Sequence, residues 1–474
     1  MRKKLFQFTT LLFALSIIFP AKIFSQNYIL TGKWIGVLKI SGIELHLVFN
    51  VSKEKGRYKA TMDSPDQGAK GIQVDKVTYE KNKVRFDVSV INGFFEGEIN
   101  KEGNKITGKW TQGPNTLPIV LEKTTKEYKL DRPQEPKPPF PYLSEEIVFR
   151  NKKDNINLAG TLTLPKGKGP FKAAILITGS GPQNRNEELL GHKPFLVIAD
   201  YLTRNGIAVL RYDDRGIGKS EGEFPKATSL DFASDALSAV QYLKTRKEID
   251  SKKIGLIGHS EGGLIAPIVA AKTKDVAFII LLAGPGLPGS KIITLQGELI
   301  ARANGESEEN IKLSKDFNTK VFNEINSQPD DQKLKVNLNK MFSDFYNGLT
   351  KEEKEKTGSK KSFMSRSKTI LTPWFRFFLK YDPRPTLEKV KCPVLALNGE
   401  KDLQVPAKED LSEIKKALKK GGNKNFKIVE LPGLNHLFQT AKTGSPSEYS
   451  KITETFSPKA LKIISDWIKK EMRK

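Results

Sequence analysis

Two patterns of hydrophobic and polar positions divide the chain. From Tyr28 to Lys123, short segments alternate between apolar and polar residues, and glycine or asparagine breaks them at intervals of about 8–12 residues. Alternation with a period of two is typical of strands that bury one face. We therefore predict a small all-β domain over residues 26–123.

The second pattern begins near residue 143. Two segments joined by a polar turn predict an antiparallel pair, and nearly continuous apolar strands then alternate with helical patterns. A mostly parallel sheet covered by helices on both faces requires such strands, so we predict an α/β domain over residues 143–474. The predicted strands are residues 173–178, 206–213, 253–258, 276–284, 392–399 and 426–433, and the predicted helices include residues 195–205, 230–245, 262–272 and 457–472.

Two stretches interrupt this organisation. Residues 124–142 hold five prolines among charged residues, which predicts an extended linker between the domains. At about residues 287–390, a lysine-rich and helix-patterned insertion breaks the strand alternation. An insertion of that length is usually functional, so we predict a helical cap. Near its end lie Trp374, Phe375 and Phe378, which either line a substrate pocket or pack the core of the cap itself.

The first 25 residues predict export. A basic start at Arg2, Lys3 and Lys4 precedes an apolar run from Leu5 onward, and the small residue Ser25 stands at the end. This order is typical of a secretory signal peptide, and the apolar run is short for a membrane anchor, which is the alternative. We expect a periplasmic or extracellular protein without a transmembrane segment in the mature chain.

The charge balance narrows the possible partners. Lys and Arg number 79 against 54 Asp and Glu, a formal net charge of +25 over 474 residues. The lysines are dispersed and no basic run alternates with aromatic residues, so we expect no nucleic-acid partner. Loose association with an anionic envelope surface fits this charge. Cys392 is the only cysteine, so the fold must rest on its core rather than on an internal disulfide.

The segment LIGHSEGG, residues 256–263, contains the clearest chemical signal. A predicted strand leads directly into Ser260, and a predicted helix follows at once. In a strand–turn–helix elbow, the nucleophile adopts a strained backbone conformation, and larger residues two positions before and after it would clash. Gly258 and Gly262 meet that demand. Ser260 is therefore the candidate nucleophile, and a structural turn without chemistry is the alternative.

A serine nucleophile of this kind needs an acid and then a histidine later in the chain. His436 follows the last predicted strand, where the base belongs, and Asp402 follows the strand at residues 392–399, where the acid belongs. Glu400, which comes early after the strand, and Asp410, which falls in a helical pattern, are alternative acids. The other histidines are His46 in the β-rich part, His192 before the first predicted helix, and His259 beside Ser260.

An oxyanion hole requires two backbone donors. One is the amide of Glu261, directly after the nucleophile, and the other belongs to the glycine-rich loop after the strand at residues 173–178, with Ser180 or Gly181 as the donor. The GKS string at residues 218–220 lacks the upstream glycine of a phosphate loop. With no cysteine cluster or H-E-x-x-H motif, we expect neither a metal nor another cofactor.

With these residues identified, the chain from about Ser144 to its end resembles the α/β-hydrolase superfamily. The segments GSGPQNRN, HKPFLVIADYL, RYDDRGIGKS, GHSEGG, TPWFRFFLKYDP and GEKDLQVP are similar to those of bacterial serine esterases of the dienelactone hydrolase-like and serine aminopeptidase-like group. Members of that group often carry a β-rich N-terminal domain containing DSPDQGAKG, here residues 63–71. The resemblance implies ester hydrolysis by Ser260, His436 and Asp402. Thr178 departs from the HG form of the oxyanion loop.

The leading hypothesis is a secreted serine esterase that acts on small or medium acyl esters through an acyl-enzyme. A serine peptidase or thioesterase would use the same three residues, and an aminopeptidase would also need a carboxylate to hold the substrate amine. In a third hypothesis, the β-rich domain binds an envelope or glycan ligand and the hydrolase part is vestigial.

Overall fold

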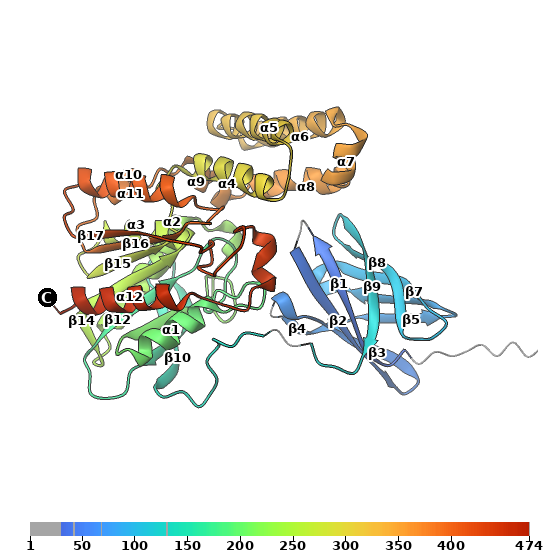
Figure 1. The fold of residues 1–474 in the computed structure, drawn as a ribbon, viewed down its shortest axis with the longest axis horizontal. Helices are drawn as coiled ribbons and strands as arrows, with labels where there is room; N and C mark the ends of the chain where they lie inside the picture. Colours follow the sequence, from blue (N-terminus) through green and yellow to red (C-terminus); the bar gives the residue numbers. More distant parts are fainter. Residues whose placement is uncertain (1–29, 41–42, 68, 129–130, 474) are drawn as a thin grey trace, which may run out of the picture.

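The protein consists of an antiparallel β domain beside an α/β domain, with a helical cap over the α/β domain (Figure 1). The computed structural model describes residues 30–40, 43–67, 69–128 and 131–473. The predicted signal peptide, residues 1–25, lies outside the described residues. Both domains and the cap belong to one chain, in which residues 125–142 connect β9 to β10.

The β domain is one nine-stranded antiparallel sheet in the order β4-β3-β2-β1-β9-β8-β7-β6-β5. Phe49 on β2 stacks on Phe86 on β6 with ring centroids 4.6 Å apart, so distant strands of the sheet curl over a shared core. The alternation seen in the sequence buries this inner face. The strands are β1 Gly32–Ile40, β2 Ile43–Glu54, β3 Arg57–Ser64, β4 Ala69–Val74, β5 Lys76–Glu80, β6 Lys83–Val88, β7 Gly93–Ile99, β8 Lys105–Gln112 and β9 Asn115–Thr124, with the short helices η1 Pro65–Gln67 and η2 Ser89–Ile91.

The α/β domain contains an eight-stranded sheet in the order β10-β11-β13-β12-β14-β15-β16-β17. β10 and β11 are antiparallel, and the strands from β13 to β17 run parallel to one another. The predicted fold class, a mostly parallel α/β sheet after an all-β domain, is confirmed. The strands are β10 Leu143–Asn151, β11 Ile156–Leu164, β12 Phe171–Ile177, β13 Ala208–Tyr212, β14 Ile249–His259, β15 Phe278–Leu282, β16 Val394–Gly399 and β17 Phe426–Leu431.

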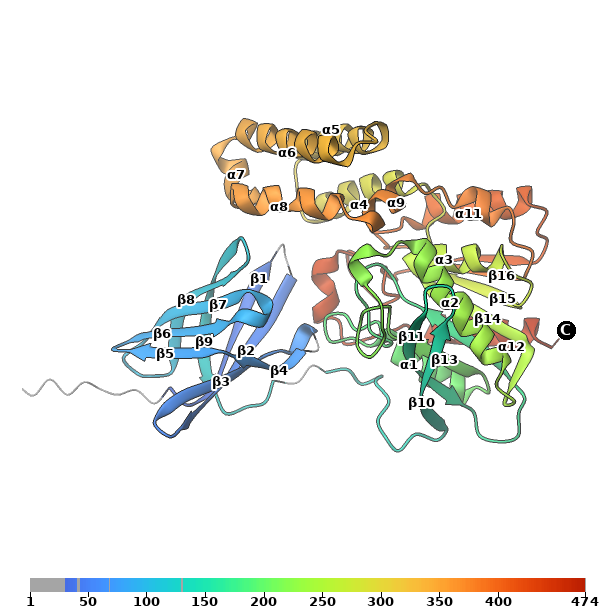
Figure 2. The same ribbon diagram turned by 180° about the vertical axis from the view of Figure 1, so that it is seen from behind.

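Helices cover both faces of this sheet, which explains why its central strands are apolar throughout. α1 and α12 pack on one face, and α2, α3 and α11 pack on the other (Figures 1 and 2). The two faces form separate hydrophobic clusters. The helices are α1 Pro194–Arg204, α2 Ser229–Lys244, α3 Glu261–Ala270, α11 Ala407–Lys420 and α12 Pro458–Glu471, with the short helices η3 Phe224–Lys226 and η4 Pro446–Lys451.

The insertion between β15 and β16 forms the helical cap. Its longer helices bury a small core of their own, to which Phe322, Leu334 and Phe363 contribute. Among the described residues, no helix is long and apolar enough to span a bilayer. The cap helices are α4 Gly289–Ala303, α5 Glu308–Ser327, α6 Asp331–Gly348, α7 Lys351–Thr357, α8 Lys360–Ile370, α9 Pro373–Lys380 and α10 Arg384–Leu387.

Candidate active site

Ser260 stands in a sharp corner between β14 and α3. Its backbone has φ 51° and ψ −116°, a conformation that residues with side chains rarely adopt. Such strain costs about 1–3 kcal/mol and is concentrated at functional sites. The surroundings impose it, because the Ser260 amide donates to the Leu282 carbonyl at 2.8 Å while the helix starts at the next residue. Ser260 itself remains half-buried at the edge of the sheet.

The glycines around Ser260 are sterically required. A Cβ atom on Gly258 would lie 1.9 Å from the carbonyl oxygen of Gly262, and one on Gly262 would lie 2.1 Å from the carbonyl oxygen of Ile177. Both separations are far below van der Waals contact. The corner therefore exists only with these two glycines, as the spacing in the sequence predicts.

His436 and Asp402 meet in the loops after β16 and β17. His436 Nδ1 lies 2.8 Å from Asp402 Oδ2, and both residues are buried. The other oxygen of Asp402 accepts the amides of Gln404 and Val405 at 2.8 and 2.9 Å, so its carboxylate is fixed in orientation. A carboxylate on Nδ1 keeps the proton there and leaves Nε2 free to act as a base.

The two alternative acids are engaged elsewhere. Glu400 accepts the amide of Gly433 at 2.8 Å. Asp410 accepts the amides of Gly286 and Leu287 at 2.6 and 3.1 Å, where the chain leaves the sheet toward the cap, and burial raises its pKa to about 7. Of the three carboxylates considered in the sequence, Asp402 is the one that contacts His436.

The loop after β17 that carries His436, called the base loop below, lies directly beside the elbow. The ring of His259, the residue before Ser260, packs near the ring of His436 with centroids 4.9 Å apart. Within the described residues, no hydrogen bond joins the Ser260 hydroxyl to His436. Catalytic hydrogen bonds of this kind are often long without substrate and shorten when it binds. The arrangement brings Ser260, His436 and Asp402 to the same edge of the sheet.

Asn435 holds the base loop in place, and the sequence reasoning missed it. Its side-chain oxygen accepts the amides of Leu437 and Gln439 at 3.0 and 2.9 Å, and its Nδ2 donates to Gln439 Oε1 at 3.0 Å. Asn435 is fully buried. An asparagine that binds backbone two residues later is a typical turn former, and its position before His436 was the available signal.

Two segments that supply backbone amides lie next to Ser260: the start of α3 and the loop after β12. Glu261 is the first residue of α3, so its amide has no partner within the helix and stands at the positive end of the helix dipole. Across from it, a Cβ atom on Gly179 would lie 3.2 Å from Ser260 Cβ. The Gly179 amide already donates to Glu187 at 2.7 Å. A second donor must therefore come from farther along, and Ser180, which is exposed, or Gly181 remains the prediction.

The loop after β12 is anchored by two aspartates that directly follow β13. Asp214 accepts the Thr178 hydroxyl at 2.7 Å and the Gln183 amide at 3.0 Å. Arg185 binds Asp213 through its guanidinium at 2.7 Å. Through these bonds, the aspartates of the RYDD segment hold the GSGPQNRN segment beside the elbow.

His259 forms a buried ion pair that the sequence did not reveal. Its Nδ1 lies 2.9 Å from Glu187 Oε1, and its Nε2 lies 3.0 Å from the His436 carbonyl oxygen. Both partners are acceptors, so the ring must carry protons on both nitrogens. Burial alone would lower the pKa of His259, but the Glu187 carboxylate raises it above the ordinary value of 6.5. Because Glu187 also binds Gly179, this pair joins the elbow, the oxyanion loop and the base loop.

Replacing Glu187 should therefore destabilise the protein. Glu187→Gln leaves the His259 charge buried without its anion, and we expect a loss of about 3 kcal/mol in the free energy of unfolding. A histidine whose pKa is raised by folding stabilises the folded protein fully at pH values below its unfolded pKa. This contribution is lost as the pH rises through its folded pKa. The deficit, measured by urea denaturation, should thus be largest near ~pH 6 and shrink at higher pH.

Glu188→Gln is the matched control, because Glu188 is a half-exposed neighbour whose contact is a 3.4 Å hydrogen bond from Asn184. We expect a change within about 0.5 kcal/mol. Equal losses in the two variants, or a deficit that grows with pH, would contradict the buried pair.

The side chain of Glu261 connects the elbow to the cap. Its Oε1 accepts hydrogen bonds from the Ser229 hydroxyl at 2.5 Å and from the indole of Trp374 on α9 at 2.8 Å. Burial raises the pKa of Glu261 to about 7, although these two bonds favour the ionised form. A carboxyl that is partly neutral repels a developing oxyanion less than a fully ionised carboxylate at the same position would.

The remaining sequence candidates have structural partners. Of the three predicted pocket residues, Trp374 reaches the elbow, Phe378 is buried in the main core and Phe375 packs on the core of the cap. His192 contacts Thr455 Oγ1 and the Tyr449 carbonyl oxygen, and burial lowers its pKa to about 4. Among the described residues, no group of three or more His, Cys, Asp or Glu side chains is arranged as metal ligands.

The sequence matches a known family across the site. The family described as "Serine aminopeptidase, S33" matches residues 195–440, just over half of the chain. Esterase EstD of Thermotoga maritima is 27% identical over 307 residues, which cover 64% of this chain and 64% of EstD. Human acyl-coenzyme A thioesterase 1 is 26% identical over 190 residues, covering 39% of this chain and 41% of that protein.

The chain also aligns with solved structures at low sequence identity. The Pyrococcus furiosus esterase Pf2001 aligns over 69% of this chain and 93% of its own, with 17% identity and a TM-score of 0.41. Est1E from Butyrivibrio proteoclasticus, solved with bound ferulic acid, aligns over 69% of this chain and 97% of its own, with 19% identity and a TM-score of 0.37.

Proposed function

The chain belongs to the serine aminopeptidase S33 family of α/β-hydrolases, and from that premise we propose that it is an exported serine esterase. The observation that carries the proposal is the pair of His436 and Asp402, 2.8 Å apart, beside the strained corner at Ser260. Nucleophile, acid and base then follow one another along the chain in the order typical of this fold.

The proposed reaction proceeds in two halves. Ser260 Oγ attacks the ester carbonyl while His436 Nε2 takes its proton, and Asp402 stabilises the imidazolium that forms. The oxyanion receives the Glu261 amide and a second amide from the loop of Ser180 and Gly181. His436 then returns the proton to the leaving alcohol, and water releases the acid from the acyl-enzyme by the same steps.

The hydrogen bonds made by the carboxylates near Ser260 favour an esterase over an aminopeptidase. An aminopeptidase would need a free carboxylate to hold the substrate amine. Three buried carboxylates of the elbow and of the loops beside it are already engaged: Glu261 with Ser229 and Trp374, Glu187 with His259, and Asp214 with Thr178. EstD, a relative named as an esterase, supports the same choice, although this chain spans 64% of its length.

Export completes the proposal and rests on residues 1–25, whose basic start and apolar run are typical of a signal peptide. We place the mature enzyme in the periplasm or outside the cell. Its substrate is a small-molecule carboxylic ester, and its net charge of +25 favours loose contact with anionic envelope surfaces.

Two measurements on the full chain test the function. A fluorophosphonate probe should label one peptide, which contains Ser260, because the probe reacts with an activated serine. A panel of short p-nitrophenyl esters should be hydrolysed far faster than the matching aminoacyl amides. Faster cleavage of the amides would identify a peptidase instead, and the absence of both labelling and turnover would reject a serine hydrolase.

A further inference from the structure

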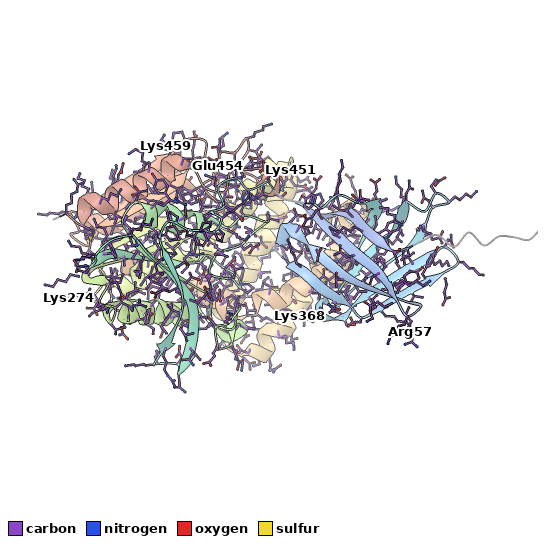
Figure 3. The ribbon with its side chains drawn as sticks, turned by 90° about the horizontal axis from the view of Figure 1, so that it is seen from below. Arg57, Lys274, Lys368, Lys451, Glu454 and Lys459 are labelled. Atoms are coloured by element: carbon purple, nitrogen blue, oxygen red, sulfur yellow. The ribbon has the colours of Figure 1, made fainter. Side chains whose placement is uncertain are left out.

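The β domain contacts the α/β domain at the loops that follow the carboxyl ends of the parallel strands (Figure 1). β2 runs beside η4, and Lys451 Nζ lies 3.8 Å from Glu44 Oε2 across the junction. Figure 3 labels Lys451 at this boundary. The pair is accessible to solvent and contributes little energy, but it marks which edge of the β domain faces the α/β domain.

The linker fastens this junction. Arg132 donates to three backbone carbonyls at 3.0, 3.1 and 3.1 Å, those of Leu190, Ser450 and Ile452. Gln134 donates to the Phe456 carbonyl at 2.7 Å and accepts the Thr455 amide at 2.6 Å. The segment between the domains is therefore bound to the loop that follows His436 and is not a free tether.

Leu45 on β2 adds an apolar contact at the same place. It packs against a small buried cluster of the α/β domain that consists of Leu190, Leu437 and Tyr449. Leu437 directly follows His436, and Tyr449 accepts a hydrogen bond at 3.0 Å from Gln404, whose own amide binds Asp402. Leu45 itself is partly exposed. The β domain thus contacts Leu437, the immediate neighbour of His436, and is connected to Asp402 only indirectly, through Tyr449 and Gln404.

The chemistry defines which part of a substrate meets this surface. The imidazole that takes the serine proton must deliver it to the leaving oxygen, so the alcohol group of the ester lies on the His436 side. From this geometry we propose that the β domain forms the outer wall of the leaving-group side, and that Leu45 limits the size of the alcohol accepted. The inference rests on the proposed esterase function.

The cap contacts the β domain at a second place. Ser362 on α8 donates to Asn115 on β9 at 2.6 Å. Beside this bond, a cleft of about 450 Å³ lies between Asn92 and Pro114 of the β domain and Lys368 of the cap. Contacts with both the base loop and the cap hold the β domain in one orientation, which a wall that discriminates by size requires.

Two ester series on the full chain test the proposal. One keeps an acetyl group and varies the alcohol from ethyl to benzyl, and the other keeps a nitrophenyl alcohol and varies the acyl chain. Leu45→Trp should lower kcat/KM for the bulky alcohol relative to the small one by about tenfold, and Leu45→Ala should raise that ratio. In both variants, the ratio of kcat/KM between the longest and the shortest acyl chain should stay within about twofold of the wild-type ratio.

Val120→Trp is the control, because Val120 is a 41% exposed apolar residue of β9 in the same domain and should leave both ratios unchanged. If the Leu45 variants lower kcat/KM equally in both ester series, Leu45 only supports the conformation of the His436 loop, and the proposal is overturned. Alcohol ratios that do not move would overturn it as well. A wild-type chain inactive on every ester would instead reject the esterase function itself.

Discussion

Ser260→Ala should reduce kcat for a short p-nitrophenyl ester by about 10⁵-fold, because the acyl-enzyme cannot form without the hydroxyl. Binding and the oxyanion donors would remain, so some rate above that in water persists. The alanine occupies the same strained corner with φ 51°, and its smaller side chain creates no clash. Initial rates and fluorophosphonate labelling, measured at equal concentrations of folded protein, check this prediction.

Ser180→Ala is the control for this experiment. Ser180 lies in the glycine-rich loop beside the elbow and is exposed, and we assign it only a backbone donor, which alanine retains. Its kcat should stay within about threefold of the wild type. Loss of labelling in Ser180→Ala with retention in Ser260→Ala would move the nucleophile to the other loop.

Asp402→Asn should lower kcat by about 10⁴-fold with little change in fold. The asparagine can still occupy the turn, because its oxygen accepts the amides of Gln404 and Val405. Its NH₂ group, however, would donate to His436 Nδ1 and place the imidazole proton on Nε2, the atom that must accept the proton of Ser260. The hydrolysis rate against pH, compared with the thermal midpoint of unfolding, separates this chemical effect from instability.

Glu400→Gln and Asp410→Asn test the alternatives directly. Glu400 binds the backbone of Gly433, and Asp410 binds the start of the cap connection, so each variant should keep kcat within about tenfold of the wild type. If Asp410→Asn loses activity as Asp402→Asn is expected to, while Asp402→Asn remains active, the acid would have to be reassigned.

Much of the fold was predictable because local patterns and burial agree. Strand β15 is buried along its whole length, and the apolar run at residues 276–284 already indicated it. The corner at Ser260 was also predictable, since the elbow tolerates only glycine at positions 258 and 262 and the sequence has glycine at both, between a strand pattern and a helix pattern. The position of Asp402 after a strand end favoured it as the acid, although Glu400 and Asp410 remained possible choices.

What the sequence could not provide were contacts between loops far apart in the chain. The Glu187–His259 pair spans 72 residues, and Leu45 lies almost 400 residues before Leu437. No local spacing encodes such pairs, because they depend on how β strands are ordered in the sheet and how the domains are packed. The same reason explains why the sequence placed His259 beside Ser260 but did not reveal its ion pair with Glu187.

The sequence alone therefore determined the strands, the elbow and the order of the candidate catalytic residues, since glycine sterics and hydrophobic periodicity act over a few residues. The tertiary structure decided which carboxylate meets His436, which charge compensates His259, and which side of the site the β domain faces. Those choices depend on parallel strands that bring distant loops to one edge, where burial makes each unpaired polar group costly.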